Sequence, residues 1–461
     1  MRNVRPATSI ESYFLSSLSR REGFTMSKDL SQIKKEFVTG KVKQQELEMK
    51  IFEDLYGSDP GKVKNACQDA AIIRGEVIEE QSGVSLNLIK NSQVDNGNLV
   101  GGNTIIPGIE MKVGAALIPM GIAGPMEITG EYAKGDIYIP LATNEAALIA
   151  GVQRGIKAIN MAGGLKTMVH YDGMTRAPLI EAPDIYEGKK LCDEVQTNKE
   201  LIKELNSCIN DPFVRLEYIE PYQLGTKVFL RMVFKTGDAM GMNGVTKASA
   251  DITKYLLAKL KNWELITVSS NMCTDKKAAH VNILKNRGKG VETEIFIPEE
   301  VLKQVFKKGV TSRKVEKVVF HKCYLGSCLS GTISGFNVNA ANSIAAFFAA
   351  TGQDLAQVIS SSSCFVQADA KEDGLHFMVS LPCLEVATIG GGTMFGTARE
   401  ALKLIGCDGF GSSVDDNNNV LRLAEIAAAT VTALEFNTAC SQAAAYEMAE
   451  SHVRLARGEK A

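Results

Sequence analysis

The chain has 461 residues, of which 45% are hydrophobic and 23% charged, and its formal net charge is −2 at pH 7. This is the composition of an ordinary soluble globular protein, and the length allows roughly three domains. The small net charge excludes a strongly basic surface for nucleic acid, and no segment reaches the ~20 consecutive apolar residues that a membrane span requires. We therefore expect a cytoplasmic protein with neither nucleic-acid nor membrane partners.

Residues 1–26 and residues 27–100 differ in character. The first segment is polar and basic and lacks the apolar centre of a secretory signal, so we expect a disordered extension. The second segment is rich in charge, and its apolar residues recur with the 3.6-residue spacing of amphipathic helices. A helical N-terminal domain is therefore predicted, ending near the turn signal at residues 94–97.

From residue 101 the chain becomes rich in glycine and poor in charge, which marks the start of a larger domain. The segments up to Thr143 predict strands and tight turns. Residues 145–162 predict a helix whose start is capped by Thr143 or Asn144.

Residues 177–268 form a distinct segment within this larger domain. The order strand, helix, hairpin, helix, strand predicts a small α+β plait, with the hairpin turn at Leu224 and Gly225. The larger domain resumes at residue 269 and closes with a long, alanine-rich helical stretch. The pattern predicts an α+β protein whose large domain, residues 101–176 and 269–461, is interrupted by the plait.

The ten cysteines and five histidines do not form a metal-binding pattern. No C-x-x-C pair occurs, and the C-x4-C spacing of Cys323 and Cys328 has no second pair to complete a zinc site. Scattered single cysteines are typical of buried thiols in a reducing cytosol. We expect no metal site.

Three charged residues stand together in the stretch VSSNMCTDKKAAHVN, namely Asp275, Lys276 and Lys277. The preceding Ser, Asn and Thr residues favour a helix start, so both lysines are predicted in or near a first helical turn. A cation there faces the positive end of the helix dipole, which makes better sense if an anion binds nearby. The residues by themselves also fit a solvated turn, which is the commoner origin of such a run.

Other candidate residues are equally open when taken singly. Glu145 and Asp354 lie at predicted helix starts, where carboxylates are common, and His452 lies at the basic end of the last helix. Glycine-rich turns at residues 238–244 and 389–393 bring bare backbone N–H groups to helix starts, as phosphate binding requires. They do not spell the dinucleotide fingerprint G-x-G-x-x-G, and most such turns are only turns.

Eight sequence blocks, taken in order, resemble the 3-hydroxy-3-methylglutaryl-CoA (HMG-CoA) reductase family. They span roughly residues 101–457 and read IPMGIAGP, PLATNEAALIAGVQRG, GMTRAP, GDAMGMN, VSSNMCTDKKAAHVN, GFNVNAANSIAAFFAATGQD, LEVATIGGGT and AESHVRLAR. The DKK and GQD forms are most similar to the biosynthetic class of eukaryotes and archaea. One block would be weak support for the family, but eight in the family's order are specific.

The resemblance implies roles for particular residues of this chain. The catalytic positions of the family match Glu145, Lys276, Asp354 and His452. Positions that bind substrate match Arg154, Arg176, Ser269, Asp275, Lys277, Lys322 and Asn342, with Arg154 a coenzyme A contact. Positions that bind the cofactor match Asp211, Phe213, Asp238, Met240, Gly241, Met242, Asn243, Gly390, Gly391 and Gly392.

The resemblance also implies a fold, an assembly and a reaction. The expected fold has a helical N-terminal part, a large α/β domain around a central helix, and an inserted ferredoxin-like small domain. The expected assembly is a homo-oligomer, at least a dimer, with active sites at the subunit interface. The expected reaction reduces HMG-CoA to mevalonate and CoA with two NAD(P)H, through mevaldehyde. Catabolic oxidation of mevalonate and an inactive CoA-ester-binding relative are the alternatives.

Three departures from the family pattern qualify these expectations. Many members of the class have Ser-Arg before the phenylalanine of the inserted domain, whereas this chain has Asp211 and Pro212 before Phe213. Because an aspartate repels a 2′-phosphate and accepts from a ribose 2′-hydroxyl, we expect a preference for NADH. Asn339 stands where a histidine is frequent, which leaves one contact at the rim of the site open. Gly458 replaces a regulatory serine of some eukaryotic members, so phosphorylation there is not expected.

Overall fold

The computed structural model describes residues 28–106, 108–306, 309–450 and 453. The extension expected over residues 1–26, His452 and Gly458 lie outside the described residues. The chain forms two compact units, which divide between Leu117 and Ile118. The sequence-based division at residue 100 and the boundaries of the plait remain predictions.

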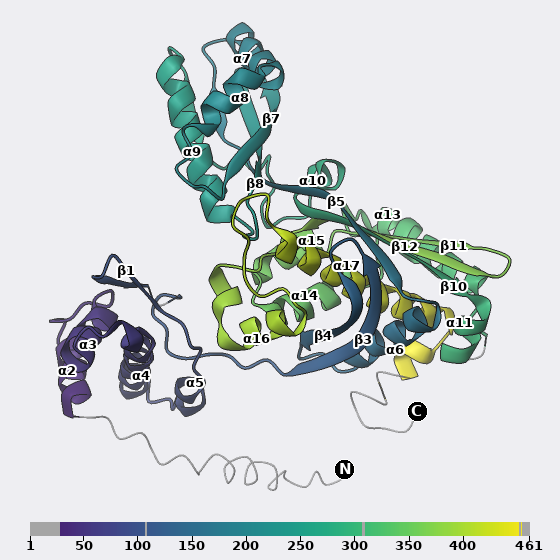
Figure 1. Ribbon diagram of the computed structural model, residues 1–461, viewed down its shortest axis with the longest axis horizontal. Helices are drawn as coiled ribbons and strands as arrows, with labels where there is room; N and C mark the ends of the chain where they lie inside the picture. The colour runs from purple at the N-terminus through teal and green to yellow at the C-terminus, as the bar shows by residue number, and fades with distance from the viewer. Residues whose placement is uncertain (1–27, 107, 307–308, 451–452, 454–461) are drawn as a thin grey trace, which may run out of the picture. The chain divides into compact units, whose positions relative to one another are not determined.

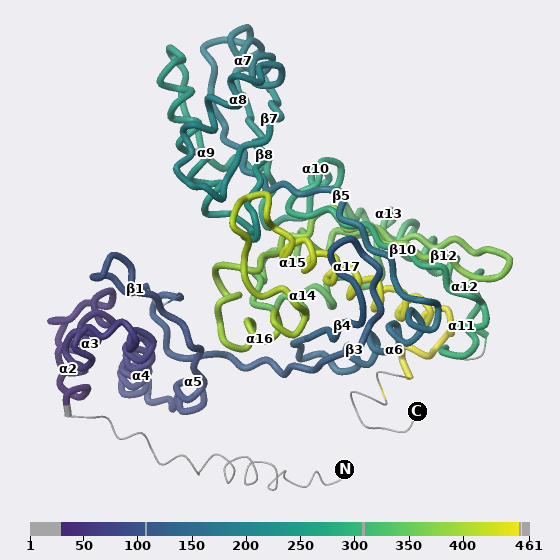
Figure 2. Tube along the Cα trace, in the orientation of Figure 1, coloured from purple at the N-terminus to yellow at the C-terminus, as the bar shows by residue number. Residues whose placement is uncertain are grey.

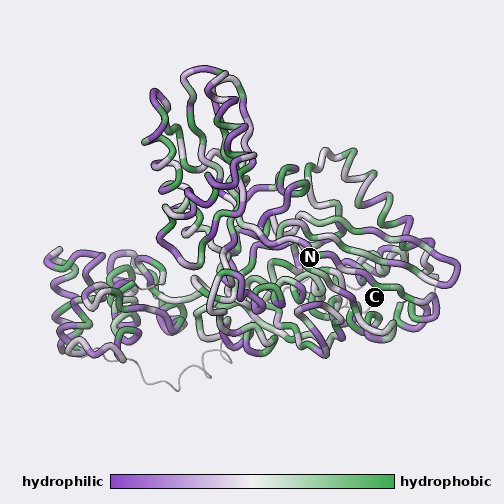
Figure 3. The backbone as a smooth tube through the Cα atoms, turned by 45° about the horizontal axis from the view of Figure 1, so that its top comes forward, coloured by the Kyte–Doolittle hydropathy of each residue, from purple (hydrophilic) through white to green (hydrophobic). Residues whose placement is uncertain are grey.

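The first unit is mainly helical, as its apolar spacing predicts. Its elements are α2 (Lys28–Val38), α3 (Leu47–Tyr56), η1 (Pro60–Lys62), α4 (Val63–Ser82), α5 (Asn87–Asn91) and a two-stranded sheet of β1 (Asn98–Val100) and β2 (Thr104–Ile106). Ile51 and Phe52 of α3 share a core with Ile73 of α4. Beside this core, Arg74 and Glu48 form a buried ion pair with Nη1 and Oε1 2.7 Å apart. Hydrophilic and hydrophobic segments alternate along these helices (Figure 3).

The second unit is built on a ten-stranded sheet (Figures 1 and 2). The strands of its larger part are β3 (Met120–Gly130), β4 (Lys134–Ala142), β5 (Leu165–Arg176), β10 (Gly288–Pro298), β11 (Phe365–Ala370) and β12 (Gly374–Leu384). The path of paired strands runs β11-β12-β10-β5-β8-β6-β9. Strand β5 belongs to both halves of this path, because residues 166–173 pair with β10 and residues 174–176 pair with β8.

Helices cover the larger part of the sheet and supply its core. They are α6 (Leu148–Met161), α10 (His280–Lys285), α11 (Glu299–Val305), α12 (Ser312–Val318), the π-helical η2 (Val319–Gly326), α13 (Ser327–Ser330), α14 (Ala340–Thr351), η3 (Leu355–Gln357), α15 (Val358–Ser361), η4 (Gly391–Met394), α16 (Gly396–Leu404) and α17 (Asn418–Ala443). Helix α17 is buried over residues 420–441 except at Arg422, so it is apolar on nearly all sides. Helices α6, α12 and α14 and strands β5, β10 and β12 all contact it.

Small residues allow this close packing around α17. A Cβ atom on Gly155 of α6 would lie 2.0 Å from the carbonyl oxygen of Ala433 on α17. Only glycine at position 155 lets the two helices approach this closely, because a side chain there would collide with backbone. The long alanine-rich stretch of the sequence is therefore a packing surface on every side.

The inserted plait has the connectivity that its sequence pattern predicts. Its elements are β6 (Leu179–Glu181), α7 (Ile185–Thr197), α8 (Lys199–Asn206), β7 (Arg215–Leu224), β8 (Lys227–Lys235), α9 (Met242–Lys259) and β9 (Glu264–Thr267). The antiparallel order β7-β8-β6-β9 is that of a ferredoxin-like plait. Ile180, Leu230 and Ile252 belong to a hydrophobic cluster separate from that of the larger part.

Two predicted helix starts are wrong, and both errors lie at candidate site residues. Helix α6 begins at Leu148, because Ala147 has a left-handed φ of 72° and residues 143–147 form a turn instead. Helix α10 begins at His280, because Thr274 and Lys276 have φ values of 45° and 55°. A helix cannot run through left-handed residues, so Glu145 and Lys276 lie in the loops that precede these helices.

Among the described residues, the structure contains no helix long and apolar enough to cross a membrane.

Candidate active site

Lys276 and Asp354 form the central ion pair of the site. The Lys276 Nζ lies 2.9 Å from Asp354 Oδ2, and the two side chains are 43% and 33% exposed. Asp354 precedes η3, as predicted, and its other oxygen accepts a hydrogen bond from Ala356 N at 3.1 Å. The hydrogen bond to Asp354 raises the pKa of Lys276, which keeps its ammonium charged.

The preceding residue, Asp275, is held from three sides. Its Oδ1 accepts from Gln357 Nε2 at 2.9 Å and from Arg287 Nη2 at 3.2 Å, and its Oδ2 lies 4.0 Å from Arg176 Nη1. Burial opposes the charged form of this carboxyl group. The hydrogen bond from Gln357 and the nearby guanidinium groups outweigh burial, so the pKa of Asp275 is lowered.

Arg176 connects this loop to the end of β5. Its Nη1 donates to Ser269 Oγ at 2.8 Å, and its Nε donates to Thr246 Oγ1 in the first turns of α9 at 3.0 Å. Lys277 is exposed, and its Nζ donates to the backbone oxygen of Asp275 at 2.9 Å. Arg176, Ser269, Asp275 and Lys277 therefore lie around Lys276, which forms a concentration of cations suited to an anionic ligand.

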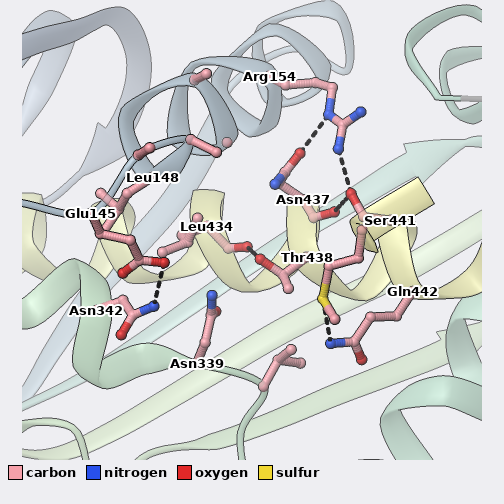
Figure 4. Close-up of a pocket in the computed structure, with 16 residues that line it drawn as sticks. Glu145, Leu148, Arg154, Asn339, Asn342, Leu434, Asn437, Thr438, Ser441 and Gln442 are labelled. Carbon is pink, nitrogen blue, oxygen red and sulfur yellow. Dashed lines mark hydrogen bonds between the residues drawn. The ribbon is translucent and has the colours of Figure 1, made fainter. Parts of the chain in front are cut away.

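Glu145 lies on the wall of a cavity of about 390 Å³. Its Oε1 accepts a hydrogen bond from Asn342 Nδ2 of α14 at 3.2 Å, while Thr143 Oγ1 accepts from the Glu145 backbone N–H at 3.0 Å. Asn339 lines the same cavity. Figure 4 shows Glu145 and Asn342 at one end of this group of side chains and Arg154 at the other.

Arg154 is already paired within the chain. Its Nε donates to Asn437 Oδ1 at 2.6 Å, its Nη1 forms an ion pair with Glu447, and its Nη2 donates to Ser441 Oγ. Its guanidinium carbon lies 5.2 Å from the centre of the Phe306 ring. A phosphate or carboxylate arriving at this end of the cavity would meet a fixed, partly exposed guanidinium group.

Within the described residues of one chain, Asp354 does not bridge Lys276 and Glu145. Within the described part of the chain, Glu145 bonds to Asn342 and Asp354 bonds to Lys276, and no hydrogen bond joins the two carboxylates. Lys322 is exposed on η2. The structure thus presents two separate clusters, one around Lys276 and one around Glu145.

The residues expected at the cofactor lie mostly in turns of the plait and of the larger part. Gly241 has a φ of 86° directly before α9, between Met240 and Met242, and Asn243 follows in the first turn. Gly390 and Gly391 have φ values of 85° and 55° before and within η4. No atom lies within 4 Å of a Cβ built on Gly390 or Gly391, so their backbone faces open space.

The side chain of Asp238 serves the fold instead. It is 4% exposed, and its two oxygens accept from Gly411 N and Val420 N, each at 2.8 Å. Burial is the largest influence on this carboxyl group and raises its pKa despite these hydrogen bonds. Because Val420 lies in the first turn of α17, Asp238 fixes the start of that helix, and only its backbone remains for a ligand.

Asp211 and Phe213 lie on the segment before β7. Asp211 Oδ1 accepts from Phe213 N at 2.9 Å, and the Phe213 ring meets the Phe410 ring edge-on, with centroids 6.4 Å apart. A Cβ built on Gly244 of α9 would lie 3.6 Å from Asp211 Oδ2. This carboxylate is therefore next to the first turn of α9, beside the glycine turn that begins with Asp238.

Sequence patterns did not single out Arg287, Glu385 or Gln357, yet all three border the site. Arg287 contacts Asp275, and its Nη1 forms an ion pair with Glu385, which precedes the glycine-rich η4. Gln357 lies three residues after Asp354. Glu385 lies within a sequence block named above, whereas Gln357 and Arg287 lie three and five residues beyond two others, and only the folded contacts reveal their orientation toward Asp275.

The fold and site together are those of an enzyme with a lysine-centred anion site next to glycine turns suited to a nucleotide. The profile of the family described as hydroxymethylglutaryl-coenzyme A reductase matches residues 70–457. The chain belongs to this family, as the eight sequence blocks predicted. Its activity is the reduction of HMG-CoA in the mevalonate pathway, an oxidoreductase reaction.

Curated relatives support this membership over most of the chain. The chain is 43% identical over 391 residues to the 3-hydroxy-3-methylglutaryl-coenzyme A reductase of Aeropyrum pernix, covering 85% of this chain and 90% of the relative. It is 38% identical over 393 residues to that of Methanocaldococcus jannaschii, covering 84% and 93%. It is 35% identical over 439 residues to reductase 3 of Hevea brasiliensis, covering 94% and 70%.

Solved structures of bacterial members share the fold. The 3-hydroxy-3-methylglutaryl-coenzyme A reductase of Streptococcus pneumoniae matches with a TM-score of 0.56 and 18% identity, covering 80% of this chain and 96% of that one. A structure of the class II enzyme from the same organism, bound to NADPH in open conformations, matches with a TM-score of 0.55 and 19% identity, covering 72% and 86%. At this level of identity the likeness concerns the fold.

Proposed function

We propose that Lys276 is the electrostatic catalyst in the reduction of HMG-CoA to mevalonate and CoA, which proceeds through mevaldehyde. The ion pair of Lys276 with Asp354 at 2.9 Å is the observation that carries this proposal. Two hydrides are required to take a thioester to a primary alcohol, and a bound NAD(P)H supplies each of them. Each hydride addition develops negative charge on the substrate oxygen, and the Lys276 ammonium is the donor that stabilises it.

The state of Lys276 suits this task. Its raised pKa keeps it protonated at neutral pH, and its backbone is fixed in the left-handed region next to the anchored Asp275. A preorganised donor stabilises a developing oxyanion without reorganisation during the reaction. Loss of one such donor typically costs about 2.7–4 kcal/mol of barrier.

We assign the two ends of the substrate to the two clusters. Arg176 and Lys277 bind the free carboxylate of the hydroxymethylglutaryl group, with Ser269 beside them, because guanidinium and ammonium groups match a carboxylate in charge and geometry. Arg154 binds the coenzyme A portion at the far end of the 390 Å³ cavity. Lys322 and Asn342 contact the substrate between these ends, and Asn342 also orients Glu145.

Proton transfers complete the reaction. Collapse of the hemithioacetal releases the CoA thiolate, and His452 protonates it so that it cannot add back to mevaldehyde. Glu145 supplies the proton for the alcohol oxygen after the second hydride. Once a second copy of the chain completes the site, Asp354, which is ion-paired with Lys276, links this lysine to the proton donor.

The active site is completed by a second copy of the chain. Glu145 and the Lys276–Asp354 pair do not contact each other within the described residues of one chain, which supports an assembly of at least two subunits with interfacial sites. Mixing the inactive variants Lys276→Ala and Glu145→Gln tests this arrangement after subunit exchange. One intact site per mixed dimer would restore up to about a quarter of the activity. No recovery in a mixture whose subunits have exchanged would place Glu145 and Lys276 of one chain in the same site.

The glycine turns before α9 and at η4 bind the nicotinamide cofactor, because their backbone N–H groups are accessible near helix starts. The open space beside Gly390 and Gly391 fits a phosphate approaching the backbone. NADH is the preferred form, because Asp211 places a carboxylate beside α9 where a 2′-phosphate would need a cation. Nearby Arg215 does not offer one freely, since it forms a bidentate pair with Asp415 at 2.6 and 2.8 Å.

HMG-CoA-dependent oxidation of NADH and NADPH by the purified protein is the direct test of the function. Turnover with mevalonate as the product is expected. Binding of a CoA ester without turnover with either cofactor would identify an inactive relative. Efficient oxidation of mevalonate without measurable reduction would favour the catabolic direction.

A further inference from the structure

Arg287 is a fully buried charge that no substrate-binding role explains. It lies between α10 and β10, and its side chain is 0% exposed. Its Nε donates to Thr175 Oγ1 at the end of β5 at 3.1 Å, its Nη1 pairs with Glu385, and its Nη2 lies 3.2 Å from Asp275 Oδ1. One guanidinium group therefore connects the end of β5, the segment after β12 and the lysine loop.

The partner of Arg287 is equally buried. The Glu385 side chain is 0% exposed, and its backbone N–H donates to Ser361 Oγ at 3.1 Å. A buried carboxylate is costly unless a cation accompanies it. Glu385 and Asp275 together carry two negative charges, and Arg287 and Arg176 carry two positive charges, so the cluster is balanced. Removal of Arg287 would leave the buried Glu385 charge uncompensated, and removal of Glu385 would leave Arg287 with Asp275 as its remaining carboxylate partner.

The cluster fixes the residue that precedes Lys276. Asp275 Oδ1 receives both Arg287 Nη2 and Gln357 Nε2, and Gln357 belongs to η3, the short helix that Asp354 caps. The Lys276 φ of 55° is unfavourable for a side chain of this kind, and such a conformation persists only where neighbouring contacts impose it. Anchoring Asp275 is what imposes it here, and the same contacts set the separation of Lys276 from Asp354.

We infer that Arg287, with Glu385, is a positioning residue for Lys276 in the reduction. The pair acts by holding Asp275, so that the Lys276 ammonium meets the reacting oxygen, and Arg287 Nη2 also lies 2.9 Å from Met242 Sδ at the start of α9. This inference rests on the catalytic role proposed for Lys276. It extends the site to two buried residues that lie behind the lysine loop.

The test compares Arg287→Met, Arg287→Lys and Glu385→Gln with Arg74→Met. Arg74 is the matched control, because it forms a buried ion pair with Glu48 in the first unit. Arg287→Met is expected to lower kcat about 100-fold, the typical effect of displacing a catalytic group by about 1 Å. Because Arg176 keeps its contacts to Ser269 and Thr246, KM for HMG-CoA should stay within about tenfold. Arg287→Lys should recover part of kcat, and Glu385→Gln should lower it about tenfold by releasing Arg287.

Rates are compared per folded molecule, with the folded fraction taken from thermal unfolding. Arg74→Met is expected to lower the melting temperature while kcat stays within about twofold. The inference is overturned if Arg287→Met has an unchanged kcat per folded molecule, or if its kcat falls no more than that of Arg74→Met. If Arg287→Met does not fold, the isosteric variant Glu385→Gln takes its place, and its kcat per folded molecule is compared with that of Arg74→Met. An unchanged kcat would then overturn the inference. An active Lys276→Ala variant would instead overturn the catalytic role of Lys276. Failure of that role is thereby distinguished from failure of the positioning role of Arg287.

Discussion

Glu435 of α17 holds the backbone of Asn339. Its Oε1 accepts from Asn339 N at 2.7 Å, and its Oε2 accepts from Val338 N at 2.6 Å. These two residues immediately precede α14, whose Asn342 donates to Glu145. A fully buried carboxylate on the central helix therefore fixes the wall of the cavity on which the proposed proton donor lies.

The pKa of Glu435 predicts a pH-dependent stability. Burial raises this pKa from 4.5 to about 7 although two backbone N–H groups and the charge of Lys322 favour the charged form. Between these values the folded state binds more protons at Glu435 than the unfolded state, so the stability that this group contributes is full below pH 4.5 and is lost as pH rises through about 7. The change is on the order of 3 kcal/mol. Cys323 and Cys364, which also lie near Glu435, have raised pKa values and stay neutral in this range.

Melting temperatures of Glu435→Gln between pH 5 and pH 8 check this prediction. The decline between pH 5 and pH 7 should be smaller in the variant than in the unmodified protein. Glu425→Gln is the control for kcat, because Glu425 lies on the same helix and accepts from the backbone of Tyr132 and Ala133, between β3 and β4. Only the change at position 435 should also lower kcat. Parallel pH curves for the unmodified protein and Glu435→Gln would refute the assignment.

Replacing Lys276 by alanine should abolish reduction and leave HMG-CoA affinity within roughly tenfold, because the ammonium acts mainly on the oxyanion that forms during reaction. Calorimetric binding and steady-state rates measure the two effects separately. Lys277→Ala is the neighbouring control. It should raise KM more than it lowers kcat, because its partner is the carboxylate present throughout the reaction. Intact turnover in Lys276→Ala would exclude the oxyanion role.

Restoring the common family residues at the cofactor should change the nucleotide preference. The double variant Asp211→Ser, Pro212→Arg removes a carboxylate and adds a cation near α9, which should raise kcat/KM for NADPH relative to NADH by tenfold or more. Asp415→Asn weakens the pairing of the two Arg215 Nη atoms and leaves Nε bonded to Glu217, so it should shift the ratio in the same direction by a smaller factor. A many-fold preference of the unmodified enzyme for NADPH would contradict the role given to Asp211.

His452→Gln should separate the two reductions. Reduction of HMG-CoA releases a thiolate that needs a proton. Reduction of added mevaldehyde releases no thiolate. We therefore expect the variant to lose most of the first activity and to keep most of the second. Rates measured with each substrate under the same conditions provide the comparison. Equal losses with both substrates would argue against protonation of the thiolate by His452.

The sequence pattern predicted the elements of the plait, the closing helix and the family because these features depend on local periodicity and on short blocks. It misplaced the starts of α6 and α10, where left-handed residues such as Ala147 and Lys276 interrupt helical patterns. Apolar spacing carries no information about these φ values, which the surrounding contacts impose.

Long-range contacts account for what the sequence did not reveal at the site. Arg287 reaches Asp275 twelve residues away and Glu385 nearly a hundred residues away, through strands that pair only in the folded chain. The side chain of Asp238, which the sequence blocks place in the cofactor turn, accepts hydrogen bonds from Gly411 N and Val420 N. These partners also lie far away in the sequence. The residue type determines which interactions a side chain can make, and the tertiary fold determines which residue it interacts with.

The passage of β5 from one sheet region to the other has a mechanical consequence. Its pairing with β10 and then with β8 is continuous through Arg176, and Arg176 also bonds to Thr246 of α9. The plait is therefore attached through a hydrogen-bonded strand and a guanidinium group rather than through flexible linkers alone. Any tilt of the plait that opens the cofactor turn would strain the contacts of Arg176. Exchange of a spent nucleotide and binding of the substrate carboxylate would then depend on the same displacement of the plait.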